Sequence, residues 1–253
     1  MLPWLLGASL AAFVLQKLTL WAGGGRWLVE WLALSAWGIR HGRFWQLVTY
    51  QFLHGDLGHL FFNMLGLYLI GRELEEAIGR RHFTVLYFLS GVLGGLGFIW
   101  LEPYAPCVGA SGAVFGVLAA FAVLFPKREM VLLIFPFMPL PAWLLVSAYV
   151  LLEWLYLVGN LGGGIAHSAH LGGAIAGAVY VQVVFGSIEF GSVRRWMGRM
   201  SQFRRTRRSE ETVDREEIDR ILDKVARQGL QSLTSSERRR LEEASRQLRG
   251  WER

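Results

Sequence analysis

The chain has 253 residues, of which 53% are hydrophobic, and it contains 11 Trp, 16 Phe and 30 Gly. This composition is too apolar for an ordinary soluble domain and indicates a membrane protein. The formal net charge is +6, but we do not expect nucleic acid as a partner.

Six apolar segments follow one another, each close to the roughly 20 residues that a helix needs to cross a bilayer core about 30 Å thick. They cover residues 3–21, 57–78, 83–101, 111–126, 141–158 and 166–187. The first has no Lys or Arg ahead of it and no small-residue cleavage site behind it, so we expect a retained anchor. The sequence therefore predicts an all-α, polytopic membrane protein with six transmembrane helices.

Basic residues gather on one side of these segments, which predicts the orientation because positive charge favours the cytoplasmic side. They follow the second, fourth and sixth segments: Arg72, Arg80 and Arg81, then Lys127 and Arg128, then seven Arg between residues 194 and 208. The links 102–108 and 159–165, on the other side, contain no Lys or Arg. We predict a multi-pass protein of the bacterial cell membrane with both termini in the cytoplasm.

Two connectors have their own character. Residues 22–56 combine Trp, Tyr and Arg as segments in the membrane interface do, so we expect this loop to be partly embedded. Residues 127–140 are predicted to be an interfacial connector, and Pro141 suits the first turn of the fifth helix. The single cysteine, Cys107, excludes an intramolecular disulfide and a multi-cysteine metal site, and we expect it to be a small packing residue.

The composition changes sharply after about residue 190. We predict a membrane core over 1–190, a basic membrane-proximal linker over 191–208 and a cytosolic amphipathic helical tail over 209–253. In the linker, the basic residues from Arg204 to Arg208 would lie near anionic lipid headgroups, where each contributes about 1 kcal/mol.

The tail has the pattern of a helical hairpin. Four apolar residues share one face of its first predicted helix: Ile218, Ile221, Leu222 and Val225. Gly229 is a plausible stop, and Thr234 with Glu237 forms a capping-box pattern ahead of a second helix.

Several polar residues lie inside the apolar segments, where each is a functional candidate because it is costly in lipid. His59 and Asn63 are four residues apart, which puts them on one helical face. Ser111 begins the fourth segment within "GASGAVFG", and His167 and His170 begin the sixth. All lie near the predicted non-cytoplasmic ends of their helices, at one depth.

Each of these residues also has a structural interpretation. His59 or Asn63 alone could be an interhelical hydrogen-bonding residue, and small residues around Ser111 could simply pack helices together. His54 and His167 are interpreted as structural or water-facing. Glu153, in the fifth segment, should face protein groups or water, and we favour a buried hydrogen bond over a gating role.

Their coincidence at one depth favours catalysis. A serine becomes a nucleophile when a neutral histidine within hydrogen-bond reach takes its proton, and His170 could do this for Ser111 if the sixth helix packs on the fourth. Four glycines would allow this approach because they remove side chains from the contact: Gly112 and Gly116, with Gly173 and Gly177.

With these motifs, the chain resembles the rhomboid family of intramembrane serine proteases over roughly residues 1–190. Three motifs carry the resemblance: "HGDLGHLFFN" with His59 and Asn63, "GASG" with Ser111, and "HLGGAIAG" beginning at His170. The tail also resembles a small helical extension that follows some bacterial rhomboid cores, and this likeness implies no role for it.

The resemblance implies a serine endopeptidase that cleaves transmembrane segments of other membrane proteins near the outer membrane face, without cofactor or metal. It implies a Ser–His dyad without a buried aspartate, in which Ser111 is the nucleophile and His170 the general base and acid. It further implies an oxyanion hole from the side chains of His59 and Asn63 and the Ser111 amide. Supporting positions are Gly109, Gly112, Phe115, Gly173 and Gly177, with Phe115 against the histidine.

One departure concerns the first loop, where the family often has Trp-Arg but Trp45 is followed by Gln46. The departure puts in doubt a charge contact that would anchor the loop. It does not affect the dyad.

Other functions fit the sequence less well than a rhomboid protease. A soluble α/β-hydrolase is excluded because Ser111 lacks G-x-S-x-G, and a zinc protease because His59 has no H-E-x-x-H partner. A non-catalytic rhomboid-like protein that binds membrane helices or acts in quality control stays open, as does a metal or proton pathway through His54, His59, His167 and His170. The presence of both Ser111 and His170 favours the protease.

Overall fold

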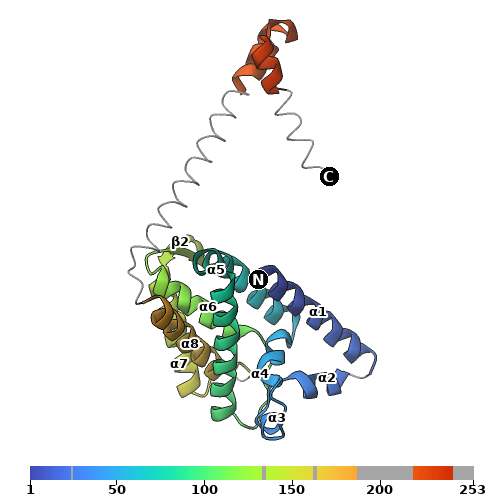
Figure 1. Cartoon of the computed structure of the whole chain (residues 1–253), viewed down its shortest axis with the longest axis vertical. Coiled ribbons are helices and arrows are strands. Elements are labelled where there is room, and N and C mark those ends of the chain that lie inside the picture. Colours follow the sequence, from blue (N-terminus) through green and yellow to red (C-terminus); the bar gives the residue numbers. More distant parts are fainter. Residues whose placement is uncertain (24, 133–134, 162–163, 187–218, 242–253) are drawn as a thin grey trace. The chain divides into compact units, whose positions relative to one another are not determined.

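The computed structural model describes residues 1–23, 25–132, 135–161, 164–186 and 219–241, and the chain divides into two compact units, Met1–Glu189 and Phe190–Arg253. The first unit is a bundle of helices (Figure 1). Its centre is formed by three helices that pack on one another, α5 (Leu57–Leu101), α6 (Ser111–Leu124) and α8 (His167–Phe185). The helix α1 (Leu2–Trp21) packs on α5 and equally on the loop that follows α1, and α7 (Ala142–Val158) packs mainly on α8.

Five apolar helices of the described residues account for the six predicted segments. They are α1 (Leu2–Trp21), α5 (Leu57–Leu101), α6 (Ser111–Leu124), α7 (Ala142–Val158) and α8 (His167–Phe185). The predicted second and third segments are the two arms of α5, which breaks at Gly79, where φ is +81° and glycine is favoured. The prediction of an all-α membrane bundle is confirmed.

Length and composition separate these helices into two groups. Within the described part of the chain, α1, α5 and α8 are long and apolar enough to cross a membrane, whereas α6 and α7 are shorter apolar helices. The helix α6 is nonetheless deeply buried, because most of its side chains pack inside the bundle.

The loop after α1 forms short helices at one end of the bundle (Figure 1). These are α2 (Gly25–Leu32), α3 (Ala36–Arg40), α4 (Gln46–Thr49) and the 3₁₀ turn η1 (Tyr50–Phe52). Large aromatic side chains are exposed along it: Trp27, Trp31, Trp37, Phe44 and Trp45. Their exposure suits the membrane interface, and partial embedding of the loop stays a prediction.

Gln46 anchors this loop without a charge. Its side chain is fully buried, and Nε2 donates hydrogen bonds to the carbonyls of Glu30 (3.2 Å) and Trp31 (3.3 Å). In the same loop, the Arg43 guanidinium makes cation–π contacts, 4.4 Å from the ring centroid of Trp31 and 4.7 Å from that of Trp37. Neutral hydrogen bonds and a cation–π contact therefore hold the loop.

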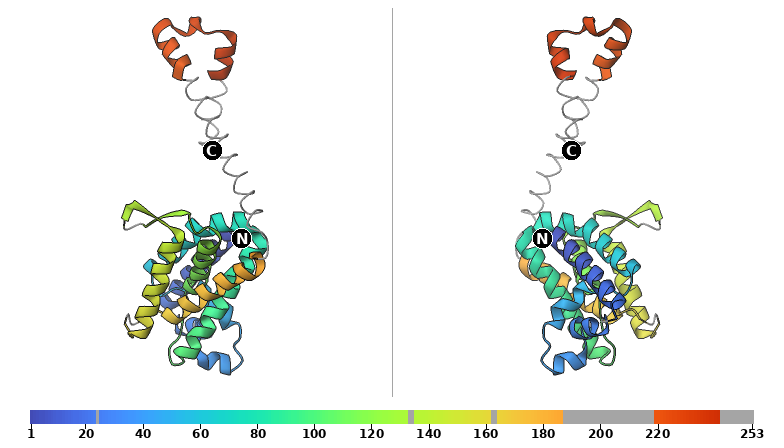
Figure 2. Two further views of the ribbon diagram at one scale, coloured as in Figure 1. Left: turned by 90° about the vertical axis from the view of Figure 1, so that its left-hand side faces the viewer. Right: turned by 90° about the vertical axis from the view of Figure 1, so that its right-hand side faces the viewer.

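The connector after α6 contains an antiparallel hairpin, which the sequence did not indicate, and its interfacial placement stays a prediction. The strands β1 (Glu129–Leu132) and β2 (Phe135–Pro141) pair in the register Glu129 with Pro141. The hairpin lies at the end of the bundle opposite α3 (Figure 2). Val, Ile and Phe in this run favour strands, and the two-stranded sheet has free edges that tolerate proline. Pro141 is the N-cap of α7, not a residue of its first turn.

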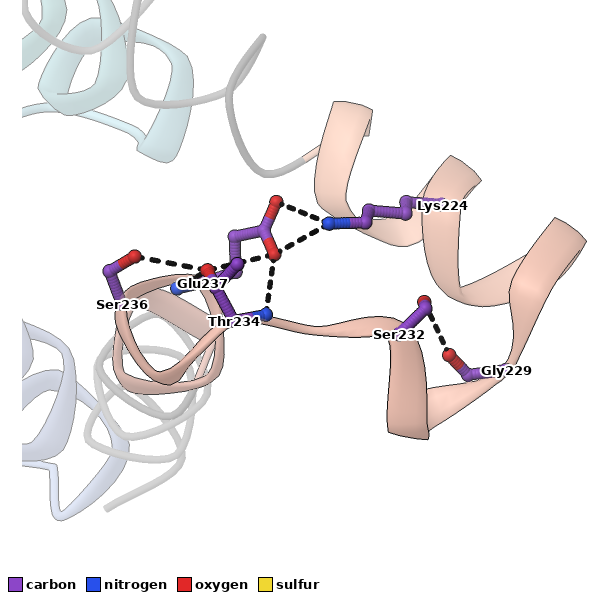
Figure 3. Close-up of polar contacts among 6 residues, drawn as sticks. All are labelled: Lys224, Gly229, Ser232, Thr234, Ser236 and Glu237. Carbon is purple, nitrogen blue, oxygen red and sulfur yellow. Dashed lines mark hydrogen bonds and ion pairs between the residues drawn. The ribbon is translucent and has the colours of Figure 1, made fainter.

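The tail forms the predicted hairpin in its described part, with helices over 219–228 and 235–241. The first helix stops at Gly229, where φ is +80°. The capping box is confirmed: the Thr234 amide donates to Oε2 of Glu237 (2.7 Å), and the Glu237 amide donates to Oγ1 of Thr234 (3.3 Å) (Figure 3). The predicted linker, including Arg204 to Arg208, and Ile218 lie outside the described residues.

Candidate active site

A tight turn delivers Ser111 as the first residue of α6. Gly109 has a φ of +126°, which an L side chain rarely adopts, and its amide donates to the Tyr50 carbonyl at 2.9 Å. Two residues earlier, Cys107 exchanges backbone hydrogen bonds with Leu34, at 2.8 and 3.0 Å. The first loop thus fixes the backbone that leads to Ser111.

Cys107 itself behaves as the small packing residue that was predicted. It is buried beside Leu34, Tyr50, Phe98 and Ala169. Burial raises the pKa of its thiol to about 12, so the thiol stays protonated at neutral pH. Cys107 is therefore not expected to act as a nucleophile.

The helices α6 and α8 touch backbone to backbone at glycines. A Cβ atom at Gly173 would lie 1.9 Å from the Gly112 oxygen, and one at Gly177 would lie 2.1 Å from the Gly116 oxygen. Real Cβ atoms do not come so close, so neither position admits a side chain without a shift of the backbone. The four glycines bring α6 and α8 into the close contact that the site requires.

This contact joins the two predicted catalytic residues. Nε2 of His170 lies 2.7 Å from Oγ of Ser111, within hydrogen-bond distance. The buried His170 ring stacks on Phe115, with the centroids 4.4 Å apart and the planes 7° apart. Stacking fixes the plane of the imidazole and so directs Nε2 toward the serine.

His59 and Asn63 lie on the first turns of α5, facing the turn before Ser111. Asp56 caps this helix by accepting the His59 amide at 2.9 Å. A Cβ atom at Gly109 would lie 2.6 Å from Nε2 of His59 and 3.8 Å from Nδ2 of Asn63. Nδ2 of Asn63 is buried and has no hydrogen-bond partner among the described residues. Both side chains thus place nitrogen atoms beside Gly109.

A carboxylate approaches the histidines from α7. Oε2 of Glu153 lies 2.5 Å from Nδ1 of His167 and 2.9 Å from Nδ1 of His170. The first contact has hydrogen-bond geometry, whereas the second is off the line of the N–H bond. Tyr156, one turn along α7, stacks on the His167 ring at 5.3 Å. Glu153 therefore faces protein groups, as the cost of a carboxylate in lipid predicts.

His54 lies next to this group but is shielded. Its side chain is fully buried, and its ring meets that of His59 edge-on at 5.1 Å. Burial lowers the pKa of His54 to about 4, and the neighbouring His59 contributes to the shift. The imidazole is therefore uncharged at pH 7. A structural role agrees with this placement.

Two polar contacts near the site were not foreseen from the sequence. The Tyr50 hydroxyl donates to the Gly91 carbonyl at 2.6 Å, and the Ser168 hydroxyl donates to Oε1 of Glu102 at 2.7 Å. The second contact joins the end of α5 to α8 two residues before His170. A glutamate at the very end of an apolar segment was the available signal for it.

Comparison with known proteins identifies the family. The Rhomboid domain model matches residues 41–187, more than half of the chain. The chain belongs to the rhomboid family. The matched range contains the residues gathered here: His59, Asn63, Ser111, Glu153 and His170. Residues 205–247 match a family of unknown function, DUF6576.

The similar rhomboid proteins include one named as a protease and one named as inactive. The chain is 33% identical to Rhomboid protein 1, mitochondrial, of Saccharomyces cerevisiae, over 59% of this chain and 44% of that protein. It is 34% identical to Rhomboid protease GluP of Bacillus subtilis, over 55% and 26%. It is also 30% identical to Inactive RHOMBOID-like protein 8 of Arabidopsis thaliana, over 40% and 27%. The matches span less than half the length of each relative.

Proposed function

We propose that the chain is an intramembrane serine endopeptidase that cleaves transmembrane segments of other membrane proteins near the outer membrane face. Ser111 is the nucleophile and His170 the general base and then the general acid. We place it in a bacterial cell membrane with both termini in the cytoplasm. Rhomboid family membership supports a function within the membrane, and Rhomboid protease GluP is a relative named as a protease.

The observation that carries the proposal is the 2.7 Å contact between Oγ of Ser111 and Nε2 of His170. In the reaction, Nε2 takes the hydroxyl proton while Oγ attacks the scissile carbonyl carbon, and the resulting imidazolium then protonates the leaving amine. Water repeats these steps on the acyl-enzyme and releases Ser111.

The developing oxyanion needs donors aimed at it. His59 and Asn63 bring side-chain nitrogens to the turn at Gly109, and the Ser111 amide opens α6 at the same turn. The amide Nδ2 of Asn63 has no partner within the described part of the chain, which suits a donor reserved for substrate.

The experiment compares cleavage of a model transmembrane substrate by the purified protein and by its Ser111→Ala and His170→Ala variants. We expect cleavage by the parent protein and its abolition in both variants, because nucleophile and base act as a unit. Circular dichroism controls for folding. Absence of cleavage by the folded parent protein, with binding of transmembrane helices retained, would instead favour a non-catalytic rhomboid-like protein such as the inactive relative.

A further inference from the structure

Resting on the proposed function, we propose that Glu153 is a positioning residue for His170, so that α7 supplies a carboxylate to a Ser111–His170–Glu153 arrangement. The resemblance to the rhomboid family implies only a serine and a histidine. In this chain, an acidic side chain from a neighbouring helix reaches the far nitrogen of the catalytic base.

The contact lies on the side of the imidazole away from Ser111. Nε2 of His170 faces Oγ of Ser111 at 2.7 Å, and Nδ1 lies 2.9 Å from Oε2 of Glu153. Nδ1 is buried, and within the described residues it has no partner that meets hydrogen-bond geometry. A small rotation would align the Nδ1–H bond with the carboxylate, and such bonds are often poorly aligned before substrate is present.

Two neighbouring helices present matching faces here. Glu153 and Tyr156 are three residues apart on α7, and His167 and His170 are three residues apart on α8. Tyr156 stacks on His167 while Glu153 contacts both histidines. The His167 bond at 2.5 Å therefore holds the carboxylate where it can meet His170.

The chemistry follows from the tautomer. When Nδ1 carries the proton and faces a carboxylate, the lone pair of Nε2 faces the serine hydroxyl. After Nε2 takes the Ser111 proton, the positive imidazolium lies beside the negative carboxylate, which stabilises the state that forms during attack. Glu153 itself neither gains a proton nor touches the substrate.

The same three side chains could be read as metal ligands, but the distances favour direct hydrogen bonding. Ligands of a tetrahedral zinc ion, bound at about 2.0–2.1 Å, lie roughly 3.3 Å apart. Oε2 of Glu153 is closer than this to both Nδ1 atoms, at 2.5 and 2.9 Å. These separations are those of a hydrogen bond to His167 and a close charge contact with His170, and they are shorter than the spacing of two ligands around one zinc ion.

The test measures how fast a small fluorophosphonate modifies Ser111 in the full-length protein, because this probe needs no transmembrane helix to enter the site. Glu153→Gln keeps the size of the side chain and removes its charge, and Glu153→Asp keeps the charge. The matched control is Glu102→Gln, since Glu102 also binds α8, through a hydrogen bond from the Ser168 hydroxyl instead of an imidazole.

We expect Glu153→Gln to lower the labelling rate, and kcat for a model transmembrane substrate, by about 10- to 100-fold. The loss should be smaller than in serine proteases with a full triad, because the contact is less well aligned. KM should stay unchanged. Glu153→Asp should recover part of the rate, and Glu102→Gln should match the parent. A parent-like labelling rate in a folded Glu153→Gln protein overturns the positioning role. Faster substrate cleavage by Glu153→Gln at an unchanged labelling rate also overturns the positioning role. In that case the contact of Glu153 with α8 would restrict substrate entry beside α7.

A spectroscopic measurement separates positioning from simple packing. With ¹⁵N-labelled histidine, the His170 resonances should report the Nδ1–H tautomer in the parent protein and a mixture of tautomers in Glu153→Gln. An unchanged tautomer contradicts the proposal. If the parent protein itself is not labelled by the fluorophosphonate, the proposed function fails, whereas labelling of the parent with no effect of Glu153→Gln removes only this inference.

Discussion

The core unit and the tail hairpin are held together by opposite means. In the core, α6 and α8 meet through the backbones of glycines, and a Cβ atom at Gly173 would come within 1.9 Å of a carbonyl oxygen. In the tail, a side-chain network at the surface joins the two helices: Lys224 donates to both carboxylate oxygens of Glu237, at 2.9 and 3.0 Å (Figure 3). The core therefore tolerates almost no added atoms at its centre, whereas the tail helices are linked by a charged pair in addition to the buried side chain of Ile221.

The difference shows how each region can change. Lipid gives helices no hydrophobic reason to associate, so close packing and buried polar contacts must hold the core. Exposed ion pairs contribute little and respond to pH and salt. Substitutions at the glycines where α6 and α8 touch should consequently lower both stability and activity, while substitutions in the tail network should leave the chemistry at Ser111 unchanged.

The largest effect is expected when the glycine contact is filled. Overpacking costs about 1–3 kcal/mol at each site, so Gly173→Ala with Gly177→Ala should destabilise the core by about 2–6 kcal/mol and abolish activity. A displacement of only 1 Å at a catalytic group can cost about 10²-fold in rate. Thermal unfolding in detergent and substrate cleavage are the measurements.

The matched control for the glycine variants is Gly97→Ala, where the new Cβ would lie an ordinary 3.6 Å from the Ser168 oxygen. We expect this variant to keep the parent Tm and rate. Parent-like stability and cleavage in the double variant would contradict the view that backbone contact between α6 and α8 builds the site.

A smaller effect is expected at the oxyanion donors. His59→Ala and Asn63→Ala should each lower kcat by about 10²- to 10³-fold, or roughly 3–4 kcal/mol, because one donor is lost while the Ser111 amide remains. KM should change little, since the ground-state carbonyl gains less from these donors. Steady-state kinetics test this. Full kcat in both variants would contradict this role and would leave His59 and Asn63 as residues of an interhelical contact.

The smallest effect on catalysis is expected from the tail. Truncation after Arg208 should leave cleavage of a generic transmembrane substrate unchanged, because the residues that meet at Ser111 all belong to the core unit. The comparison uses the truncated and full-length proteins at equal concentration in the same detergent. A folded truncated protein that cannot cleave the substrate would show that the tail is needed for the chemistry.

The stability of the tail hairpin should depend on pH through Glu237. The hydrogen bond from Lys224 lowers the pKa of Glu237 from its ordinary 4.5 to about 2. The stabilisation from the ionised carboxylate is therefore complete above pH 4.5 and is lost as the pH falls toward 2. NMR chemical shifts of the hairpin should follow this loss in the parent tail, and Glu237→Gln should remove this dependence.

The sequence predicted those parts of the site that carry their own local pattern. His59 and Asn63 share a face by spacing, Gly109 to Gly116 is a small-residue run, and His170 is followed by glycines at suitable intervals. Each pattern sits on one helix and points to close packing or chemistry there. Gly79, between two apolar runs, likewise agrees with the break inside α5.

The contact between Glu153 and His170 was not predictable in the same way. The helix α7 is apolar on nearly all sides, so its sequence does not say which face meets α8. The β1–β2 hairpin was missed because a short apolar run with prolines gives no clear period. In both cases the outcome depends on how neighbouring segments are placed, which no single segment specifies.

The most direct test of the account is to locate the fluorophosphonate adduct by peptide mass spectrometry on the full-length protein in membranes. We predict one covalent adduct at Ser111, absent from Ser111→Ala and formed much more slowly in His170→Ala, because Nε2 of His170 lies 2.7 Å from the serine hydroxyl. An unmodified Ser111 in a folded parent protein, or an equal rate in His170→Ala, would contradict it.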